Sequence, residues 1–413
     1  MSEEILKSLF EAAVASADPA DVVAGNLPPP PTGRTLVVGF GKAAAAMARA
    51  VENHWPGPLS GLVVTAYGCG APCERIEVVE AGHPVPDAAG MEAARRILKS
   101  VGGLSENDLV VCLVSGGGSA LLTLPGPGLS LADKQAVNEK LILSGASISE
   151  INCVRKHLSA IKGGRLARAA FPARLAALAI SDVPGDDLSV IASGPTVADP
   201  TTYAEARGVL EKYSISPPGA VSECLARAAD ETPKPGDQTL ARAGTVLVAA
   251  PAGALRAAAA AAQAAGLNPI ILGDAIEGES AAVAAAQARA ALGAEPGSVL
   301  ISGGETTVKV RGKGRGGPNG EFMLALAVAL DGHPGISAIA CDTDGLDGSG
   351  GAAGAVIGPT TMDRARGLGL DAVGMLTDND SYGFFSALGD LVICGPTRTN
   401  VNDFRAILIE SAR

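Results

Sequence analysis

The chain has 413 residues and a formal net charge of −11, and 47% of its residues are apolar whereas only 18% are charged. This balance excludes an intrinsically disordered chain, and the acidic excess argues against a nucleic-acid footprint or a patch that binds anionic membranes. The 53 glycines are roughly twice the usual share and follow no G-X-Y period, which excludes collagen and favours a loop-rich globular protein, of two domains at this length.

The N-terminal segment MSEEILKSLFEAAVASA predicts a helix, because its apolar residues recur with a helical period. It is acidic and lacks a basic start followed by an apolar block, and no stretch of the chain reaches the 18 or so apolar residues of a membrane span. The seven cysteines include no CxxC pair, which indicates a reducing compartment. We therefore expect a cytoplasmic protein with no membrane contact. The prolines of residues 27–34 end the first helix.

Beyond them, short apolar runs alternate with Ala-rich helical segments, which predicts an α/β fold of βαβ units with parallel sheets. We expect strands at 35–40, 61–67, 76–81, 108–116, 175–181, 245–250, 269–273, 298–303, 336–341 and 391–395. We expect helices at 43–52, 87–101, 131–143, 155–170, 252–265, 278–292 and 320–330. Because residues 213–245 hold two proline clusters and no strong strand, the expected domains are 1–235 and 236–413.

The first candidate site is VVGFGKAAAAMA, where a strand runs through a glycine turn into a helix. Its glycines, including Gly41, satisfy a G-x-G-x-x-A dinucleotide pattern. The next strand, however, ends at Tyr67 without the acid that would bind a ribose. Lys42 adds a positive charge inside the turn, which suits a phosphoryl group in transit better than a nicotinamide cofactor. A tight turn with a solvated lysine is the alternative.

The second candidate is CLVSGGGSALL, again a strand, a glycine turn and a helix. Gly116, Gly117 and Gly118 predict a nest of free backbone N–H groups, and Ser115 and Ser119 add hydroxyls, so the turn suits an anion. The spacing GxxxxGK[ST] occurs nowhere in the chain, so any use of ATP would lie outside the P-loop class. A purely structural turn is the alternative.

A basic segment follows at residues 151–167. Arg155, Ser159 and Lys162 are spaced i, i+4 and i+7, so we expect them to share one helix face and to meet a carboxylate or a phosphate. An ordinary solvated face is the alternative.

Carboxylates come next, in AISDVPGDD. Asp182 follows a predicted strand directly and Asp186 follows a Pro-Gly turn, so both are expected at the carboxyl end of the sheet, where open α/β folds bind ligands. Such oxygens suit Mg²⁺, and turn capping is the alternative.

The C-terminal half repeats this arrangement. Gly303, Gly304 and Glu305 follow a predicted strand, and a glycine-rich loop then carries Arg315. This composition suggests a mobile loop that delivers a guanidinium to a phosphate. Asp342 and Asp344 lie in the turn IACDTDGLDG after another strand, where Mg²⁺ coordination and a simple turn are both open.

The blocks GFGKAAAAMA, GHPVPDAAG, VSGGGSALL, NCVRKHLSAIKGGRLA, ISDVPGDDLSVIASGPTVADPTT, SGGETTVKVRGKGRGGPNGEF, DTDGLDGSGGAAGAVI, NDSYGFF and GPTRTNVNDF span about 39–403. Together they resemble class II glycerate kinases, and the last third resembles the MOFRL domain of that family. The resemblance implies a Rossmann-like three-layer α/β/α N-terminal domain with a parallel sheet and a smaller α/β MOFRL-like C-terminal domain. It also implies ATP-dependent phosphorylation of D-glycerate to 2-phospho-D-glycerate with Mg²⁺ or another divalent metal.

In the family, the lysine of GFGKA leads the active site, and here it is Lys42. A family arginine of the MOFRL loop falls at Pro318 in this chain, so Arg315, three residues earlier, becomes the candidate guanidinium. We expect Lys42, Asp182 and Arg315 to be catalytic, with Asp182 a general base or a Mg²⁺ ligand. The remaining expected sites are substrate binding by Ser115, Arg155 and Lys162, phosphate binding by Gly41, Gly116–Ser119, Gly303, Gly304 and Glu305, and metal binding by Asp186, Asp342 and Asp344.

The expected small-molecule partners are D-glycerate and ATP. We expect no nucleic-acid partner, and a homodimer is compatible with these expectations. An older family name, hydroxypyruvate reductase, implies the alternative of an NAD(P)H-dependent oxidoreductase. The missing ribose-binding acid and the lack of an evident pair of histidine and carboxylate argue against it. A nonenzymatic regulator that binds a sugar acid or a nucleotide would need a DNA-binding or partner module, and the sequence shows none.

Overall fold

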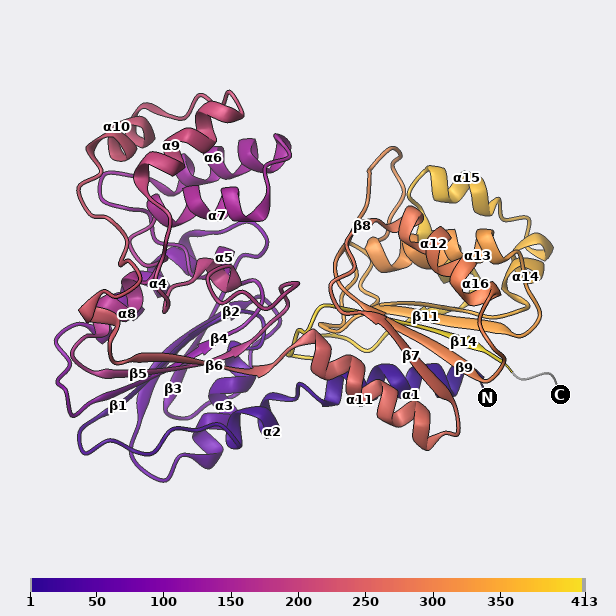
Figure 1. The fold of residues 1–413 in the computed structure, drawn as a ribbon, viewed down its shortest axis with the longest axis horizontal. Helices are drawn as coiled ribbons and strands as arrows, with labels where there is room; N and C mark the ends of the chain where they lie inside the picture. Colours follow the sequence, from indigo (N-terminus) through magenta and orange to yellow (C-terminus); the bar gives the residue numbers. More distant parts are fainter. Residues whose placement is uncertain (1, 411–413) are drawn as a thin grey trace. The chain divides into compact units, whose positions relative to one another are not determined.

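The computed structural model describes residues 2–410, which divide into two compact units. The first unit comprises residues 19–248, and the second combines residues 2–18 with residues 249–410. The N-terminal helix α1 (Ser2–Ala15), in indigo, accordingly lies beside α11 (Pro251–Ala264) (Figure 1). The boundary thus lies 13 residues after the expected 235/236, because β6 (Ala243–Ala249) still belongs to the first sheet.

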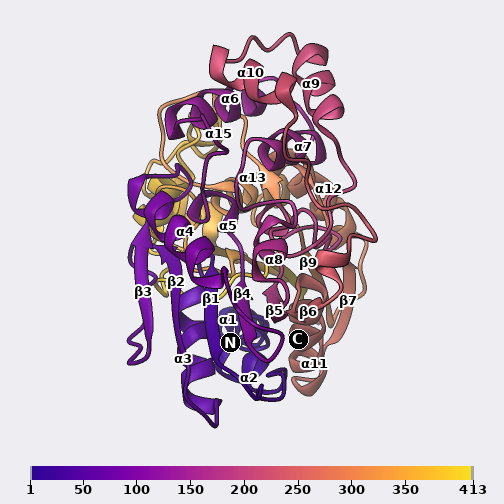
Figure 2. The same ribbon diagram turned by 90° about the vertical axis from the view of Figure 1, so that its left-hand side faces the viewer.

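The first unit is built on a six-stranded sheet in the order β3-β2-β1-β4-β5-β6, which Figure 2 shows side by side. The ladders from β3 to β5 are parallel, which confirms the predicted parallel sheet. All residues of β4 are buried, which explains why its sequence is continuously apolar rather than alternating. The strands are β1 (Thr35–Phe40), β2 (Ser60–Ala66), β3 (Ile76–Ala81), β4 (Leu109–Val114), β5 (Arg174–Ile180) and β6.

Helices cover both faces of this sheet, and four of them form a separate lobe (Figure 1). α3 packs on β1 and β2, α4 packs on β2 and β3, and a buried cluster fills the layer between the sheet and α4 and α8. The helical lobe, α6, α7, α9 and α10, has a core of its own that includes Leu141, Val154 and Leu210. The helices are α2 (Pro19–Ala24), α3 (Ala44–His54), α4 (Ala88–Val101), α5 (Gly118–Leu121), α6 (Leu131–Leu143), α7 (Ile148–His157), α8 (Arg165–Ala170), α9 (Tyr203–Lys212) and α10 (Gly219–Arg227).

The helix expected at 155–170 is broken in the structure. α7 ends at His157 and α8 begins at Arg165, because Gly163 and Gly164 have φ of +58° and +80°, a region that favours glycine. A Cβ on Gly164 would lie 2.8 Å from the carbonyl oxygen of Val197. The expectation that Arg155, Ser159 and Lys162 share one helix face is therefore wrong.

The second unit has a mixed sheet, in the order β13-β12-β11-β14-β9-β7. Within this sheet only β7 and β9 pair in parallel, so the expectation of a parallel sheet fails here. The cause is β14 (Asp403–Ile409), which the sequence analysis did not predict; it runs antiparallel between β11 and β9 and is buried along its whole length. The other strands of this sheet are β7 (Asn268–Gly273), β9 (Ser298–Gly303), β11 (Ile336–Asp342), β12 (Gly354–Ile357) and β13 (Leu391–Val392), and a separate two-stranded sheet is formed by β8 (Gly278–Glu279) and β10 (Thr306–Thr307).

Helices line this sheet as well. α1 contacts β11 and β14, α11 contacts β7 and β9, and α13 contacts β11 and β12. The further helices are α12 (Ser280–Leu292), α13 (Pro318–Leu330), α14 (Thr361–Gly367), α15 (Ala372–Thr377) and α16 (Ser381–Leu388). None of the helices between residues 2 and 410 combines the length and the apolar composition that crossing a bilayer requires.

The position of α1 yields a prediction about stability. Phe10 is buried, and its ring lies 6.1 Å from that of Phe404 in β14. Phe10→Ala should destabilise the second unit by about 3–5 kcal/mol, through lost burial and a cavity. Urea unfolding monitored by hydrogen exchange should locate the loss in residues 249–410, and the exposed neighbour Glu11 provides Glu11→Ala as a control. A loss confined to residues 19–248 would contradict the assignment of α1.

Candidate functional site

The carboxyl edge of the first sheet contains the point where the chain reverses direction across the sheet. After β1 the chain adds β2 and β3 on one side, and it then crosses over to place β4 and β5 on the other side. Open parallel sheets bind ligands outside the carboxyl ends of the strands at such a point. The turn of Lys42 and the SGGGS turn therefore meet at the position where the architecture favours a site.

The two turns are joined by hydrogen bonds. The Lys42 N–H donates to the carbonyl oxygen of Gly116 at 2.8 Å, and the Ala43 N–H donates to the Ser115 hydroxyl at 3.0 Å. Gly41 has φ +123°, and a Cβ there would lie 2.2 Å from Ser115 Oγ. Only glycine allows this approach, and the buried Ser115 hydroxyl holds the turns together.

These bonds also restrict what the first turn can bind. The Gly41 N–H donates to Val64 O at 3.1 Å, so the amides of Gly41, Lys42 and Ala43 all have partners inside the protein. In dinucleotide-binding folds the amides of this turn face the pyrophosphate. The Gly41 amide and the Ser115 hydroxyl are thus engaged in bonds within the protein, and the phosphate-binding role expected of Gly41 and the substrate-binding role expected of Ser115 stay predictions.

The second turn is available to a ligand. Within residues 2–410 the amides of Gly116, Gly117 and Ser119 make no hydrogen bond. A Cβ on Gly117 would lie 3.0 Å from His83 Nε2 and 3.4 Å from Lys42 Cγ, so these two side chains flank the turn. The Ser119 hydroxyl lies 2.9 Å from that of Ser193.

A cavity of about 740 Å³ opens beside this turn. It lies between the segments that follow β3 and β4 and the lobe helices α6 and α7. Its lining includes His83, Gly117 and Ser119, together with three cationic side chains, Lys134, Arg155 and Lys162. Although α7 and α8 do not form one helix, Arg155 and Lys162 are brought to the same cavity.

The cationic side chains are held in unusual surroundings. Lys134 Nζ is buried and has no hydrogen-bond partner, and burial, with the nearby Arg155 and Arg165, lowers the pKa of Lys134 to about 7. Lys162 is buried and donates to Ala192 O at 3.1 Å, and burial lowers its pKa well below the usual value. Arg155 donates through Nε to Asn138 Oδ1 at 2.6 Å. An anion would compensate these buried cations.

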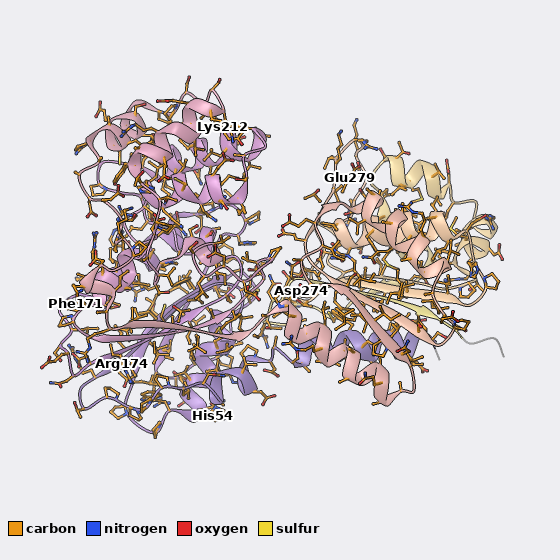
Figure 3. All side chains as sticks on the ribbon, viewed as in Figure 1. His54, Phe171, Arg174, Lys212, Asp274 and Glu279 are labelled. Carbon is orange, nitrogen blue, oxygen red and sulfur yellow. The ribbon has the colours of Figure 1, made fainter. Side chains whose placement is uncertain are left out.

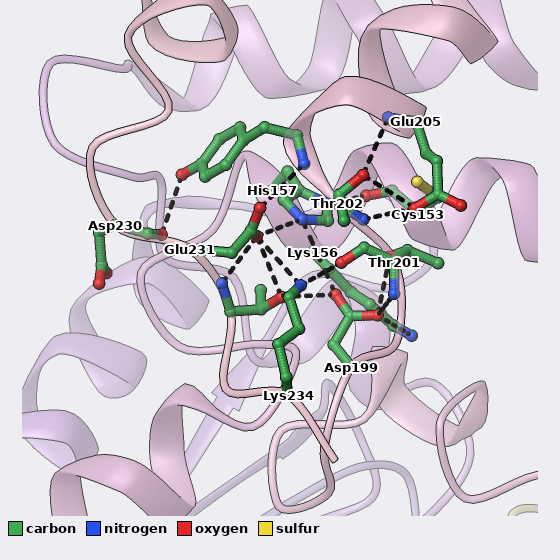
Figure 4. Close-up of polar contacts among 12 residues, drawn as sticks. Cys153, Lys156, His157, Asp199, Thr201, Thr202, Glu205, Asp230, Glu231 and Lys234 are labelled. Carbon is green, nitrogen blue, oxygen red and sulfur yellow. Dashed lines mark hydrogen bonds and ion pairs between the residues drawn. The ribbon is translucent and has the colours of Figure 1, made fainter. Parts of the chain in front are cut away.

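The other two cations of the same basic segment are used for structure. Lys156 Nζ lies 3.3 Å from Asp199 Oδ1, and both side chains are buried (Figure 4). Next to it, His157 Nε2 lies 2.9 Å from Glu231 Oε1. Arg165 contacts Asp230 and the Lys156 carbonyl. Of the four cations in this segment, Lys156 and Arg165 thus form ion pairs within the protein, whereas Arg155 and Lys162 line the cavity.

The expected carboxylates of the first unit follow β5, the neighbour of β4. Asp182 is half-buried two residues after the end of β5, at the same edge as Lys42. Asp186 has φ +55°, and its Oδ1 is buried without a hydrogen-bond partner.

In the second unit, the glycines after β9 support a buried arginine. Gly304 has φ +109°, and a Cβ there would lie 2.1 Å from the Ile276 nitrogen. Its carbonyl accepts a hydrogen bond from Arg405 Nη2 at 3.2 Å, and Arg405 also pairs with Asp403 at 2.5 Å. Glu305 is exposed. The conformation of Gly304 is thus explained by close packing, and the phosphate-binding role expected of Gly303, Gly304 and Glu305 stays a prediction.

Asp342 and Asp344 act in the turn after β11. Asp342 Oδ1 accepts the Asp344 N–H at 2.9 Å, and Asp344 Oδ1 accepts the Leu346 N–H at 2.8 Å. Asp347, three residues further on, accepts the N–H groups of Asn319 and Gly320 at the start of α13. Among residues 2–410, no group of three His, Cys, Asp or Glu side chains is arranged to hold a metal ion. Asp342 and Asp344 thus stabilise the turn, and the metal-binding role expected of them stays a prediction.

Arg315 lies in the glycine-rich loop, exposed, with its guanidinium carbon 4.5 Å from the centre of the Tyr382 ring. Arg311 of the same loop pairs instead with Glu279, which is labelled in Figure 3, at 3.0 Å. Pro318 is the first residue of α13, a position that proline favours.

Comparisons with known proteins bear on both units. The family described as a domain of unknown function, DUF4147, matches residues 5–226, and the MOFRL family matches residues 298–403. A D-glycerate 2-kinase of Thermotoga maritima is 40% identical over 97% of this chain and 95% of its own length. The crystal structure of a Thermotoga maritima glycerate kinase matches with a TM-score of 0.88 and 38% identity, over 98% of this chain and 99% of that one. The chain belongs to the glycerate kinase family with a C-terminal MOFRL domain.

Another member of the family carries a different name. A protein of Agrobacterium vitis, 55% identical over 99% of this chain and 94% of its own length, is provisionally called a hydroxypyruvate reductase. Both names occur among relatives of similar coverage, so the chemistry of the site has to distinguish between them.

The sequence analysis missed two residues of this family member's candidate site. Lys134 is one of many surface-type residues on a predicted helix, and no spacing marks it as buried. His83 stands in GHPVPDAAG, a block that carries the family resemblance, and this was the signal that could have found it.

The joined turns yield a prediction about Ser115. Ser115→Ala leaves the Ala43 N–H buried without its acceptor, so the free energy of unfolding should fall by about 1–3 kcal/mol. Chemical denaturation measures this change. Ser100→Ala is the matched control, because the Ser100 hydroxyl donates only to the Ile97 carbonyl of its own helix. Full stability combined with a large rise in KM for an anionic substrate would instead make Ser115 a binding residue.

Proposed function

We propose that the protein is an ATP-dependent glycerate 2-kinase, which converts D-glycerate and ATP to 2-phospho-D-glycerate and ADP. The observation that carries the proposal is the position of Lys42 at the reversal point of the sheet, beside a turn with unpaired amides and a cavity lined by cations. Phosphoryl transfer needs such a concentration of donors and positive charge around the phosphate oxygens. The 40% identical D-glycerate 2-kinase, matched over nearly its whole length, supports this reaction.

In this proposal Lys42 stabilises the charge on the phosphoryl group during transfer. The 2-hydroxyl oxygen of glycerate attacks the γ-phosphorus while the bond from phosphorus to the β–γ bridging oxygen breaks, and ADP leaves. The hydroxyl proton passes to a base, for which Asp182 at the end of β5 is our candidate, because its carboxylate lies at the same sheet edge. The amides of Gly116, Gly117 and Ser119 hold phosphate or carboxylate oxygens.

A divalent metal, which kinases use with ATP, is compatible with the residues present. Few carboxylates are placed to bind it, however. Mg²⁺ binds through one or two carboxylates together with phosphate oxygens and waters, so the lack of a three-carboxylate group among residues 2–410 does not conflict with it. Asp186 is our candidate ligand, since one of its carboxylate oxygens is buried and unpaired. The ion would neutralise charge on the phosphates of ATP.

The reductase alternative is favoured by the names of two relatives, which are 55% and 51% identical. Against it, β2 ends without an acid, and the residue that follows, Tyr67, bonds to Asp87 instead. The amides of the turn after β1, which would bind a dinucleotide pyrophosphate, are already paired.

Two assays with one protein sample separate these functions. ADP release with D-glycerate and MgATP reports the kinase, and loss of NADH with hydroxypyruvate reports the reductase. We expect turnover in the first assay alone. Turnover in the second alone would overturn the kinase, and silence in both would favour a binding protein.

Lys42→Ala should lower kcat for glycerate phosphorylation by about 100- to 1000-fold, because one stabilising donor is lost from the transition state. The melting temperature should stay close to that of the wild type. The exposed Lys99 provides Lys99→Ala as a control for removal of a surface lysine. Near-normal turnover of Lys42→Ala would remove Lys42 from the mechanism.

Arg315→Ala tests the guanidinium of the glycine-rich loop. If Arg315 stands in for the family arginine that Pro318 replaces, kcat should fall by about 1000-fold with a smaller change in KM. Arg311→Ala removes another exposed arginine of the same loop, which is held by Glu279, and should retain activity. Equal losses in the two variants would show only that the loop needs positive charge.

A further inference from the structure

The cavity beside the SGGGS turn combines two surfaces of different chemistry. One surface is cationic, with Lys134, Arg155 and Lys162, and no carboxylate forms an ion pair or a hydrogen bond with any of the three within residues 2–410. The other surface is apolar and is formed by prolines after β3 and by α6, with Ile142 and Leu143 exposed along it. Exposed leucine and isoleucine side chains next to buried cations are typical of a ligand pocket rather than of a solvated surface.

No protein group within residues 2–410 satisfies the Lys134 ammonium. Its ammonium nitrogen is buried and unpaired, a state that costs stability. The ammonium groups of the two buried lysines of this unit have partners, since Lys156 pairs with Asp199 and Lys162 donates to Ala192 O. An unpaired ammonium lowers the stability of the empty protein. Because this ammonium lines the cavity, we expect a bound ligand to pair with it.

The size and the charge of the cavity identify the class of ligand. A volume of about 740 Å³ is within the range of about 300–1,000 Å³ that holds drug-sized ligands, whereas a three-carbon acid would fill a small part of it. Three cationic side chains also exceed what one carboxylate requires, but they match the several charges of a triphosphate chain. The apolar surface of α6 suits the flat, largely apolar face of a base.

We propose that the nucleotide binds within this cavity of the first unit, with its triphosphate on Lys134, Arg155 and Lys162 and its base against the apolar surface of α6. The inference rests on the proposed function, which requires ATP, and it reassigns Arg155 and Lys162 from glycerate to the nucleotide. The γ-phosphate then lies toward Gly117, whose neighbours are His83 and Lys42. Glycerate would then bind on the opposite side of the SGGGS turn.

The first experiment measures binding of MgAMP-PNP, which is not hydrolysed, by isothermal titration calorimetry at pH 8. Lys134→Met should raise Kd by roughly 10- to 100-fold, the effect of losing a charged hydrogen bond. Lys140→Met is the matched control on the same helix, because exposed Lys140 contacts only Ser216 O and does not line the cavity. An unchanged Kd in Lys134→Met would overturn the proposal.

Lys134→Met should weaken nucleotide binding but stabilise the protein without nucleotide. Without nucleotide, Lys134→Met should raise Tm by about 2–4 °C at pH 6, where Lys134 is protonated, because an unpaired buried ammonium is removed. A variant that is less stable as well as weaker in binding would indicate a structural lysine, and would count against the proposal.

Proton uptake provides a test that does not depend on activity. Lys134 faces Arg155 of α7, Arg165 of α8 and Lys162 of the segment between them, and His83 and Glu139 line the same cavity. With its pKa lowered to about 7, Lys134 is mostly neutral at pH 8 in the empty protein, and a bound triphosphate raises that pKa. Binding at pH 8 should therefore take up protons, measured by titration in two buffers of different ionisation enthalpy, and Lys134→Met should lose part of this uptake. Equal uptake in both proteins would contradict the assignment.

The position of the base has its own test. Ile142 is 56% exposed, so Ile142→Ser should fold normally. It should weaken binding of MgAMP-PNP several-fold and leave binding of inorganic tripolyphosphate unchanged. An unchanged affinity for both probes would place the base elsewhere and overturn that half of the proposal.

Failure of this inference can be distinguished from failure of the proposed function. If the wild type binds MgAMP-PNP in a Lys134-dependent way but does not phosphorylate glycerate, the nucleotide site stands and the kinase assignment falls. If it phosphorylates glycerate and Lys134→Met raises only KM for glycerate, the kinase stands and the cavity is the glycerate site instead.

Discussion

The contact between the turns after β1 and β4 is the constraint on which the candidate site depends. Gly41 approaches Ser115 so closely that no side chain fits at Gly41, and the amides of the first turn are consumed in holding the two turns together. The backbone amides of the first turn are therefore unavailable to a ligand. The group that this turn can still offer to a ligand is the Lys42 side chain. The second turn keeps unpaired amides and supplies the backbone donors. A motif that looks like a dinucleotide turn thus has its amides bonded within the protein, and in the proposed kinase only its lysine side chain serves the anion site.

The second physical feature is the separation of charge within an acidic protein. With a net charge of −11, most of the surface repels ATP and glycerate. In the first unit, however, Lys156 and Arg165 take the carboxylates of Asp199 and Asp230, while Lys134 and Lys162 lie in a cavity without a carboxylate partner. Burial keeps the pKa of both cavity lysines low, so the empty cavity carries less charge than its composition implies, and an anionic ligand restores that charge.

Carboxylates in the second unit mainly organise its backbone. Asp347 accepts the first amides of α13, where the helix dipole favours a negative charge, and burial nevertheless raises its pKa to about 6. Asp403 holds Arg405 at the edge where β9 and β11 end. The aspartates of the turn after β11 bond to backbone amides in the same way. An acidic turn at a strand end is therefore not sufficient to indicate a metal site.

The sequence by itself determined the α/β class, all the strands of the first sheet and the glycine turns that follow β1 and β4, because these follow from local apolar runs and from glycines that a turn requires. It did not reveal β14, since the polar Asp403 and Arg405 interrupt its apolar run and are satisfied only by residues far along the chain. It also did not reveal that α1 belongs with the C-terminal part, or that Arg155 and Lys162 converge on one cavity without sharing a helix. Only the tertiary structure decided that the Nζ atom of Lys134 is buried and unpaired, because burial depends on how the helical lobe packs over the sheet edge and not on the spacing of residues within α6.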